Sequence, residues 1–152
     1  MTIRPNVEQF KELAGSSKEG PVVMLNLLKF KHRADGEDGS GASAYRRYGD
    51  AAVKMIEEQG GRLLWAGKAD QVLIGDPSED WDQVLLVEYP SRKSFIEMVS
   101  NPEYNKAHED REAGLERTIV VACTSVGGAV PARPPAPRRR GASAPREKTN
   151  GQ

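Results

Sequence analysis

Residues 21–30, PVVMLNLLKF, form an aliphatic run that is interrupted by one amide, Asn26, and one cation, Lys29. In an extended strand, successive side chains point to opposite faces of the sheet, so this run presents apolar residues on both faces. Each face then needs cover, and Asn26 places a polar amide inside one of them. The chain must therefore build a sheet that is protected on two sides.

Length and composition predict one folded domain followed by a basic tail. A chain of 152 residues can bury a proper core, and its single cysteine, Cys123, excludes an internal disulfide. Residues 126–152 contain five of the ten prolines, six basic residues and one acid, a net charge of +5. Such a segment cannot bury enough apolar surface to offset its ordering entropy. We therefore expect a domain over residues 1–125 and a disordered basic Pro/Arg-rich tail over residues 126–152.

Several classes of partner and cofactor are not expected. No apolar stretch is long enough to cross a membrane and no signal-peptide pattern opens the chain, so a cytoplasmic protein is predicted. The basic cluster at residues 138–140 lacks interleaved aromatic residues, so nucleic acid is not the expected partner. Two histidines and one cysteine give no zinc spacing, and no glycine-rich phosphate loop is present. We expect no metal and no cofactor.

Hydrophobic periodicity predicts an order of strand, helix, strand, strand, helix, strand. The predicted segments are a short helix over Val7–Leu13, a strand over Val22–Phe30, a helix over Ala44–Gln59 capped by Ser43, a strand over Arg62–Gly67, a short extra strand over Gln71–Ile74, a strand over Gln83–Tyr89, helices over Arg92–Val99 and Glu103–Ala113, and a strand over Arg117–Ser125. This order predicts an α+β, ferredoxin-like βαββαβ domain with a four-stranded antiparallel sheet and helices on one face.

The face of this sheet without helices predicts a homodimer. A monomer in water would alternate apolar and polar residues along its strands, but the strands over residues 22–30, 83–89 and 117–125 are apolar on both faces. Leaving one face in water would expose a large apolar patch, which monomeric proteins avoid. A second copy, related by two-fold symmetry and packed sheet against sheet, would cover it.

Five short motifs support a family resemblance. They are NLLKF at residues 26–30, Tyr45-x-x-Tyr48, Gly60-Gly61-Arg62, VEYPSRKSF at residues 87–95 and NPEYNKAHEDR at residues 101–111. In this order and spacing, residues 21–125 resemble the DUF1330 proteins of the dimeric α+β barrel superfamily. The resemblance implies the fold and the dimer. Cofactor-free quinol monooxygenases, haem-degrading enzymes, muconolactone isomerases and chlorite dismutases share this architecture and use a cavity between the sheet and the helices.

Polar residues predicted to face that cavity are the candidate site residues. Tyr104, His108 and Arg111 share one helix face, where the last two could act as a proton donor and an anion clamp. The alternative is a half-buried row that forms salt bridges with Glu88 or Glu112. Asn26 could orient a carbonyl oxygen, or its amide could simply bond the neighbouring backbone. The candidates are Asn26, His108 and Arg111 as catalytic residues and Tyr45, Tyr48, Trp65 and Tyr104 as ligand-binding residues.

Three functions stay open on the sequence alone. The favoured one is binding of a small apolar or aromatic metabolite in the sheet–helix cavity, with a cofactor-free monooxygenase or isomerase as its enzymatic form. The second is a non-catalytic dimeric interaction module that recruits a partner through the basic tail. The third is a haem-binding protein that uses His108, which requires open space beside the imidazole. Whether the protein is an enzyme is not decided by these residues.

Overall fold

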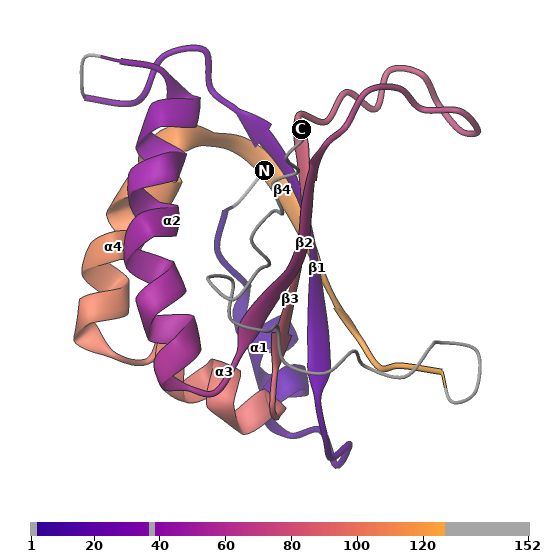
Figure 1. The fold of residues 1–152 in the computed structure, drawn as a ribbon, viewed down its shortest axis with the longest axis vertical. Coiled ribbons are helices and arrows are strands. Elements are labelled where there is room, and N and C mark those ends of the chain that lie inside the picture. Colours follow the sequence, from indigo (N-terminus) through magenta and orange to yellow (C-terminus); the bar gives the residue numbers. More distant parts are fainter. Residues whose placement is uncertain (1–2, 37–38, 127–152) are drawn as a thin grey trace, which may run out of the picture.

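The structure, a computed structural model, describes residues 3–36 and 39–126, so the expected tail after Val126 lies outside the described residues. The elements are α1 Val7–Ala14, β1 Val22–Phe30, α2 Gly41–Glu58, β2 Arg62–Lys68, β3 Gln83–Tyr89, α3 Arg92–Val99, α4 Pro102–Gly114 and β4 Leu115–Cys123 (Figure 1). The predicted order of elements is confirmed, and β1, β3 and α3 have the predicted bounds.

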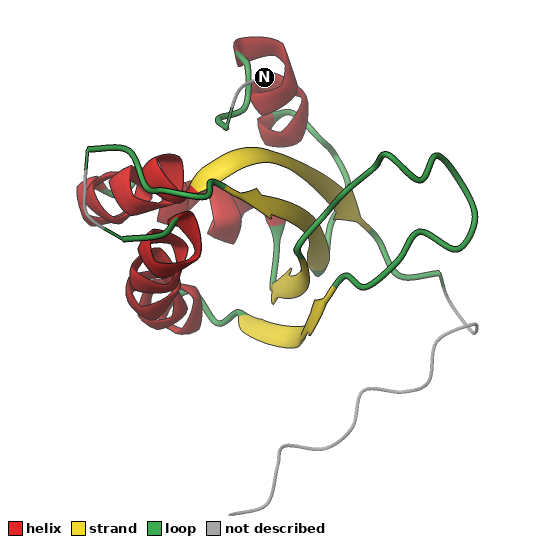
Figure 2. Cartoon of the chain, turned by 90° about the horizontal axis from the view of Figure 1, so that it is seen from above, coloured by secondary structure: helices red, strands yellow, loops and turns green. Residues whose placement is uncertain are grey.

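The four strands form one antiparallel sheet with the order β2-β3-β1-β4, and α2 and α4 cover one of its faces (Figures 1 and 2). The predicted α+β, ferredoxin-like arrangement is therefore confirmed. β1 is one of the two inner strands of the sheet and is paired along both edges, by β3 and by β4. α1 lies beside α3 at one end of the helix layer.

Side-chain caps fix where the helices begin. Asn6 accepts a hydrogen bond from the backbone N–H of Gln9 at 2.7 Å, and Ser91 accepts one from the backbone N–H of Ser94 at 3.0 Å. The prediction for α2 was wrong by three residues. Ser40, and not Ser43, is its N-cap, because the Ser40 hydroxyl accepts from the Ser43 backbone N–H at 3.1 Å.

A backbone junction joins the end of β1 to the start of α2 and the end of α4. The N–H of Lys31 donates to the carbonyl of Gly114 at 2.8 Å, and the N–H of Gly41 donates to the carbonyl of Lys31 at 3.0 Å. A Cβ atom on Gly41 would lie 2.3 Å from the Lys31 carbonyl oxygen and 2.5 Å from the Gly114 carbonyl oxygen. Both neighbours are backbone atoms, so they cannot move aside as a flexible side chain would. Glycine is required for this approach.

Two further strand predictions differ from the structure. Residues 71–74 form no strand but part of the loop between β2 and β3, where Leu73 and Ile74 are 83% and 91% exposed. With no partner strand beside it, this short apolar segment has nothing to pair with. β4 begins at Leu115, two residues earlier than predicted, because it follows α4 directly at the junction.

The core lies on the helix side of the sheet. Its buried residues come from β1, β3, α2, α3 and α4 and include Val22, Ile56, Val87, Met98 and Tyr104. The other sheet face has no helix, and Ile119 and Val121 on it are each 43% exposed. Among the described residues, no helix is long and apolar enough to cross a membrane.

The junction predicts a sharp contrast between two glycine substitutions in α2. Gly41→Ala should lower the free energy of unfolding by about 2–3 kcal/mol, because its methyl group would overlap two backbone carbonyls. Gly49→Ala is the matched control, since no atom lies within 4 Å of a Cβ placed there. It should raise the free energy of unfolding by about 0.5–1 kcal/mol through helix propensity. Urea unfolding of both variants checks this, and equal effects would contradict the role of the junction.

Candidate ligand-binding cavity

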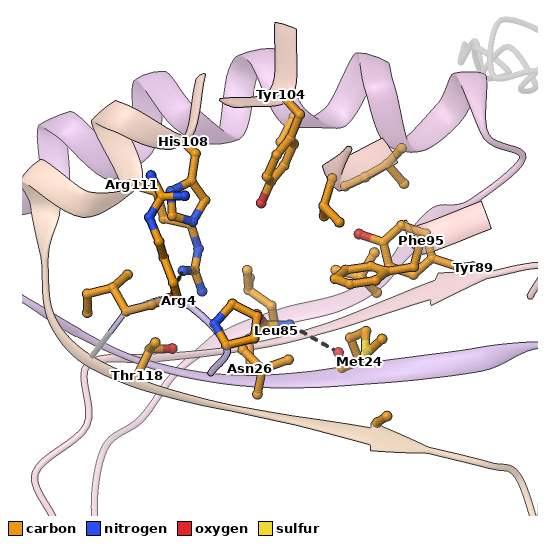
Figure 3. A pocket seen from close by; sticks show the side chains of 18 of the residues that line it. Arg4, Met24, Asn26, Leu85, Tyr89, Phe95, Tyr104, His108, Arg111 and Thr118 are labelled. Carbon is orange, nitrogen blue, oxygen red and sulfur yellow. Dashed lines mark hydrogen bonds between the residues drawn. The ribbon is translucent and has the colours of Figure 1, made fainter. Parts of the chain in front are cut away.

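A cavity of about 1440 Å³ lies between the helices and the helix-facing side of the sheet (Figure 3). Side chains from all four strands line its floor, among them Met24, Asn26, Leu85, Val87, Thr118 and Val120. Side chains from α2 and α4 face the floor, among them Tyr45, Tyr48, Tyr104, His108 and Arg111. Six of the seven candidate site residues therefore line one cavity.

Strand register places Asn26 in the middle of the floor. Asn26 is opposite Leu85 on β3 and Val120 on β4, so these three side chains share one row on the same face. The Asn26 Nδ2 donates to the carbonyl of Met24 at 3.1 Å, which is the local backbone bond expected of a structural amide. Its Oδ1 has no hydrogen-bond partner among the described residues. The Nδ2 group of the amide is thus held by the backbone, while its Oδ1 can accept a hydrogen bond from a ligand.

The spacing of α4 brings Tyr104, His108 and Arg111 onto one face, as predicted, and all three are buried. The hydroxyl groups of Tyr104 and Tyr48 are 2.8 Å apart and share a hydrogen bond. The imidazole of His108 lies against both rings, with centroid distances of 5.6 Å to Tyr104 and 6.4 Å to Tyr48. α2 and α4 thus join through an aromatic cluster that forms one wall of the cavity.

Burial keeps the phenols of this cluster neutral. Loss of solvation is the largest cause that raises the pKa of Tyr45, Tyr48 and Tyr104 above the ordinary value. The positive charge of Arg111 acts in the opposite direction on all three without cancelling the effect of burial. At neutral pH the three tyrosines are therefore hydrogen-bonding groups and carry no charge.

His108 is also neutral at physiological pH. Burial is the largest cause that lowers its pKa to about 4; the charges of Arg111 and Arg4 act in the same direction, and Glu112 opposes them. Its Nδ1 is fully buried without a hydrogen bond and lies 3.9 Å from the nearest Glu112 carboxylate oxygen. That separation is too long for a hydrogen bond. The other ring nitrogen, Nε2, is not among the fully buried unpaired atoms.

Arg111 is held by the N-terminal segment and by an aromatic ring. Its Nη1 donates to the carbonyl of Ile3 at 3.1 Å, and its guanidinium carbon lies 5.9 Å from the centre of the Tyr48 ring. The segment over residues 3–6 also contacts α4 through an ion pair between Arg4 and Glu112. Figure 3 shows Arg4, His108 and Arg111 gathered at one end of the cavity, with Tyr89 and Phe95 at the other.

The prediction that Trp65 lines this cavity was wrong. Leu63 is opposite Val87, on the helix-facing side, but the next paired residue of β2 is Trp65, opposite Leu86. The β-bulge between them adds one residue and reverses the alternation of faces. Trp65 therefore lies on the face without helices, where its ring covers Gly67, and is 54% exposed.

The suggested salt bridges of the helix row were partly wrong. Glu88 lies on the face without helices and pairs with Arg62 at 3.4 Å, far from the row on α4. Glu112 does lie near His108, but its hydrogen-bonded partner is Arg4.

Two arginines of the cavity were missed by the sequence reasoning. Arg4 precedes the first predicted helix and has no periodic signal. Arg92 is the first residue of α3 and is 92% buried, with Nη2 donating to the Thr124 hydroxyl at 3.3 Å and Nη1 left without a hydrogen bond. A charged residue at the first position of a helix is usually solvated, so its pattern gave no sign of burial.

The described part of the chain offers no set of metal ligands. Within residues 3–36 and 39–126, no three His, Cys, Asp or Glu side chains are grouped so that they could hold an ion. Lys29 lies in β1, but its side chain points to the sheet face without helices and forms an ion pair with Asp80 at 2.9 Å. The chemistry available in the cavity is thus that of guanidinium groups, neutral phenols, an imidazole and an amide.

Comparison with known proteins identifies a matching family model and similar solved structures. Residues 39–124 match the family model described as a domain of unknown function, DUF1330. Two crystal structures of the RPA0582 protein from Rhodopseudomonas palustris, a protein of unknown function, are 35% identical to this chain. The methylated form covers 85% of this chain and 98% of its own, with a TM-score of 0.80, and the other covers 82% and 96%, with a TM-score of 0.78.

Solved structures with lower sequence identity also match the chain. A DABB family protein with a ferredoxin-like fold from Mesorhizobium loti is 15% identical and has a TM-score of 0.47, covering 72% of this chain and all of its own. No curated protein matches the chain.

The low pKa of His108 predicts a pH-dependent stability. The unfolded chain binds a proton at this residue near pH 6.5, whereas the folded protein binds it near pH 4. Between these values the unfolded state binds more protons, so the contribution of His108 is present above pH 6.5 and is lost as the pH falls to about 4. His108→Gln should flatten the fall in unfolding free energy over this window.

Urea unfolding between pH 4 and 7 measures that slope. The direct measurement is an NMR titration of the imidazole carbons, with His32→Gln used to assign the signal of His108 in a chain that has two histidines. A His108 signal that titrates near pH 6.5 in the folded protein would contradict a buried neutral imidazole.

Proposed function

We propose that this chain, which belongs to the DUF1330 family of domains of unknown function, binds a small apolar or aromatic metabolite in the cavity between its sheet and its helices. The observation that carries the proposal is the cavity itself, about 1440 Å³ of space with an apolar floor and polar groups on one wall. Ligand sites are typically concave, largely apolar and equipped with a few convergent polar groups.

The polar groups supply the orientation that such a ligand needs. On the floor, the Oδ1 of Asn26 can accept a hydrogen bond from the ligand. On the opposite wall, the phenols of Tyr45 and Tyr48 can donate hydrogen bonds to it. In an enzymatic form of this function, His108 would serve as a neutral hydrogen-bonding group, since its pKa of about 4 makes it a weak base at neutral pH. No cofactor is required by any of these roles.

Haem binding through His108 is less well supported. A haem ligand needs an open approach to one ring nitrogen, but His108 is buried against the rings of Tyr48 and Tyr104. The segment over residues 3–6 covers the same end of the cavity. Recruitment of a partner through the tail concerns residues outside the described part of the chain, so metabolite binding is the function to test first.

Filling the cavity should remove binding. Leu85→Trp places an indole on the floor beside Asn26, while Leu73→Trp is the matched control in an exposed loop. We expect 2-naphthamide, a neutral aromatic probe, to raise the melting temperature of the wild type and of Leu73→Trp. At ten times the dissociation constant it should stabilise them by about 1.4 kcal/mol. Differential scanning fluorimetry and calorimetry provide the measurement, and equal binding to Leu85→Trp would contradict a ligand in this cavity.

We also propose that two copies pack through the sheet face that carries no helix. Register places Leu25 opposite Leu86 on β3 and Val121 on β4, and Trp65 lies opposite Leu86 on β2, so apolar side chains from all four strands meet there. Charged pairs, including Arg62 with Glu88, lie on the same face. An apolar centre with polar side chains beside it is typical of a protein interface. The homodimer expected from the sequence would use this face.

A single carboxylate on this face should separate the copies. Val121→Glu would bury a charge without a partner in the interface, which costs several kcal/mol, so we expect a monomer at micromolar concentration. Leu73→Glu is the control, because it adds the same charge in the exposed loop between β2 and β3. Sedimentation equilibrium gives the mass of each variant. A wild type that sediments as a monomer would reject the proposed dimer.

A further inference from the structure

We propose that the ligand of this cavity is an aromatic or apolar carboxylate whose acid group binds the guanidinium of Arg111. The inference rests on the proposed function, since it names the chemical class that the same cavity accepts. Arg111 lines the cavity and is 94% buried, so its charge is largely removed from solvent.

Within the described part of the chain, Arg111 forms no ion pair with an acid. Its guanidinium donates a hydrogen bond to a neutral carbonyl, that of Ile3, and lies over the face of the Tyr48 ring. The carboxylate next to it in sequence, Glu112, forms its hydrogen-bonded ion pair with Arg4 instead. A buried cation without an anion is costly, and a ligand carboxylate would supply that anion.

The geometry leaves room for the acid group to bind. A guanidinium has five N–H groups, and one of those on Nη1 is used by the carbonyl of Ile3. The Ile3 carbonyl engages Nη1, which leaves the N–H groups of Nε and Nη2 for a ligand carboxylate and for the neighbouring Tyr45 phenol. A planar carboxylate matches the fork of a guanidinium with two parallel hydrogen bonds. Arg111 is therefore better suited to bind a carboxylate than a compact cation such as a lysine ammonium, which cannot form two parallel hydrogen bonds.

The groups around Arg111 favour an anion over a cation. Among the residues that line the cavity, Arg4, Lys11, Lys18, Arg46, Arg92 and Arg111 are basic, and Glu12 and Asp50 are acidic. The neighbouring phenol of Tyr45 is neutral and can donate a hydrogen bond to the same carboxylate. Next to the acid group, the floor of Met24, Leu85 and Val120 accepts the apolar body of the ligand.

Two probes of equal shape separate charge from burial. 2-Naphthoate is ionised at pH 7 and 2-naphthamide is neutral, so a difference in their binding reports the acid group. We expect isothermal titration calorimetry to show about tenfold tighter binding of the naphthoate to the wild type, as a charge-assisted hydrogen bond would give. Arg111→Gln should reduce this ratio to near one. Lys93→Gln removes the same charge from an exposed site outside the cavity and should keep it.

The outcomes distinguish this inference from the proposed function. Binding of neither probe to the wild type would reject the cavity as a ligand site, and this inference with it. Equal binding of both probes would reject the carboxylate but keep the apolar cavity. A naphthoate preference that persists in Arg111→Gln would assign the acid group to another residue.

A measurement on the unchanged protein covers the case in which Arg111→Gln does not fold. The NMR signal of the Arg111 Nε–H group should shift with 2-naphthoate and not with 2-naphthamide. Arg111→Lys, which keeps the charge but loses the fork, should bind naphthoate more weakly while still preferring it to the amide. An Arg111 signal that responds to inorganic phosphate but not to naphthoate would overturn the assignment of a carboxylate.

Discussion

The backbone junction of Lys31, Gly41 and Gly114 determines where the cavity can form. Two hydrogen bonds bring the end of β1, the start of α2 and the end of α4 together, at a distance that excludes a Cβ atom. From this point α2 and α4 run together and pack chiefly on each other, with fewer contacts to the sheet. A helix pair that is anchored at one end and joined by aromatic rings can leave space above the strands without separating. The cavity is thus a consequence of how the two helices begin and end.

β1 explains most of what could be predicted from the sequence. Its two apolar faces require neighbours on both sides, which leads to a central strand, a helix layer on one face and an exposed apolar surface on the other. Helix caps such as Asn6 and Ser91 and the periodicity of α4 are local signals, and they fixed the elements and the row of Tyr104, His108 and Arg111 correctly. Six of the seven candidate residues lie on regular elements, and for these the sequence pattern predicted correctly that the side chain faces the cavity.

What the sequence did not show depends on irregular or long-range structure. The bulge in β2 changes the face of Trp65, and no residue type in that strand marks a bulge. Arg4 and Arg92 reach the cavity through contacts with Glu112 and Thr124, which are distant in the chain. Gly41 appeared to be part of a loop, because only the folded structure brings the carbonyl of Gly114 against it. In each case the deciding partner is absent from the local sequence.

The burial of Arg111 and His108 also gives the cavity a stable charge. The positive charge of Arg111 helps to keep His108 neutral, and burial keeps the three tyrosines in their phenol form. From about pH 4 to well above neutrality, none of these four groups changes its protonation. A ligand bound against the wall of α2 and α4 meets the fixed guanidinium of Arg111 and several neutral hydrogen-bonding groups. This wall recognises a ligand by shape and by charge, and changes of pH within the physiological range leave its protonation unaltered.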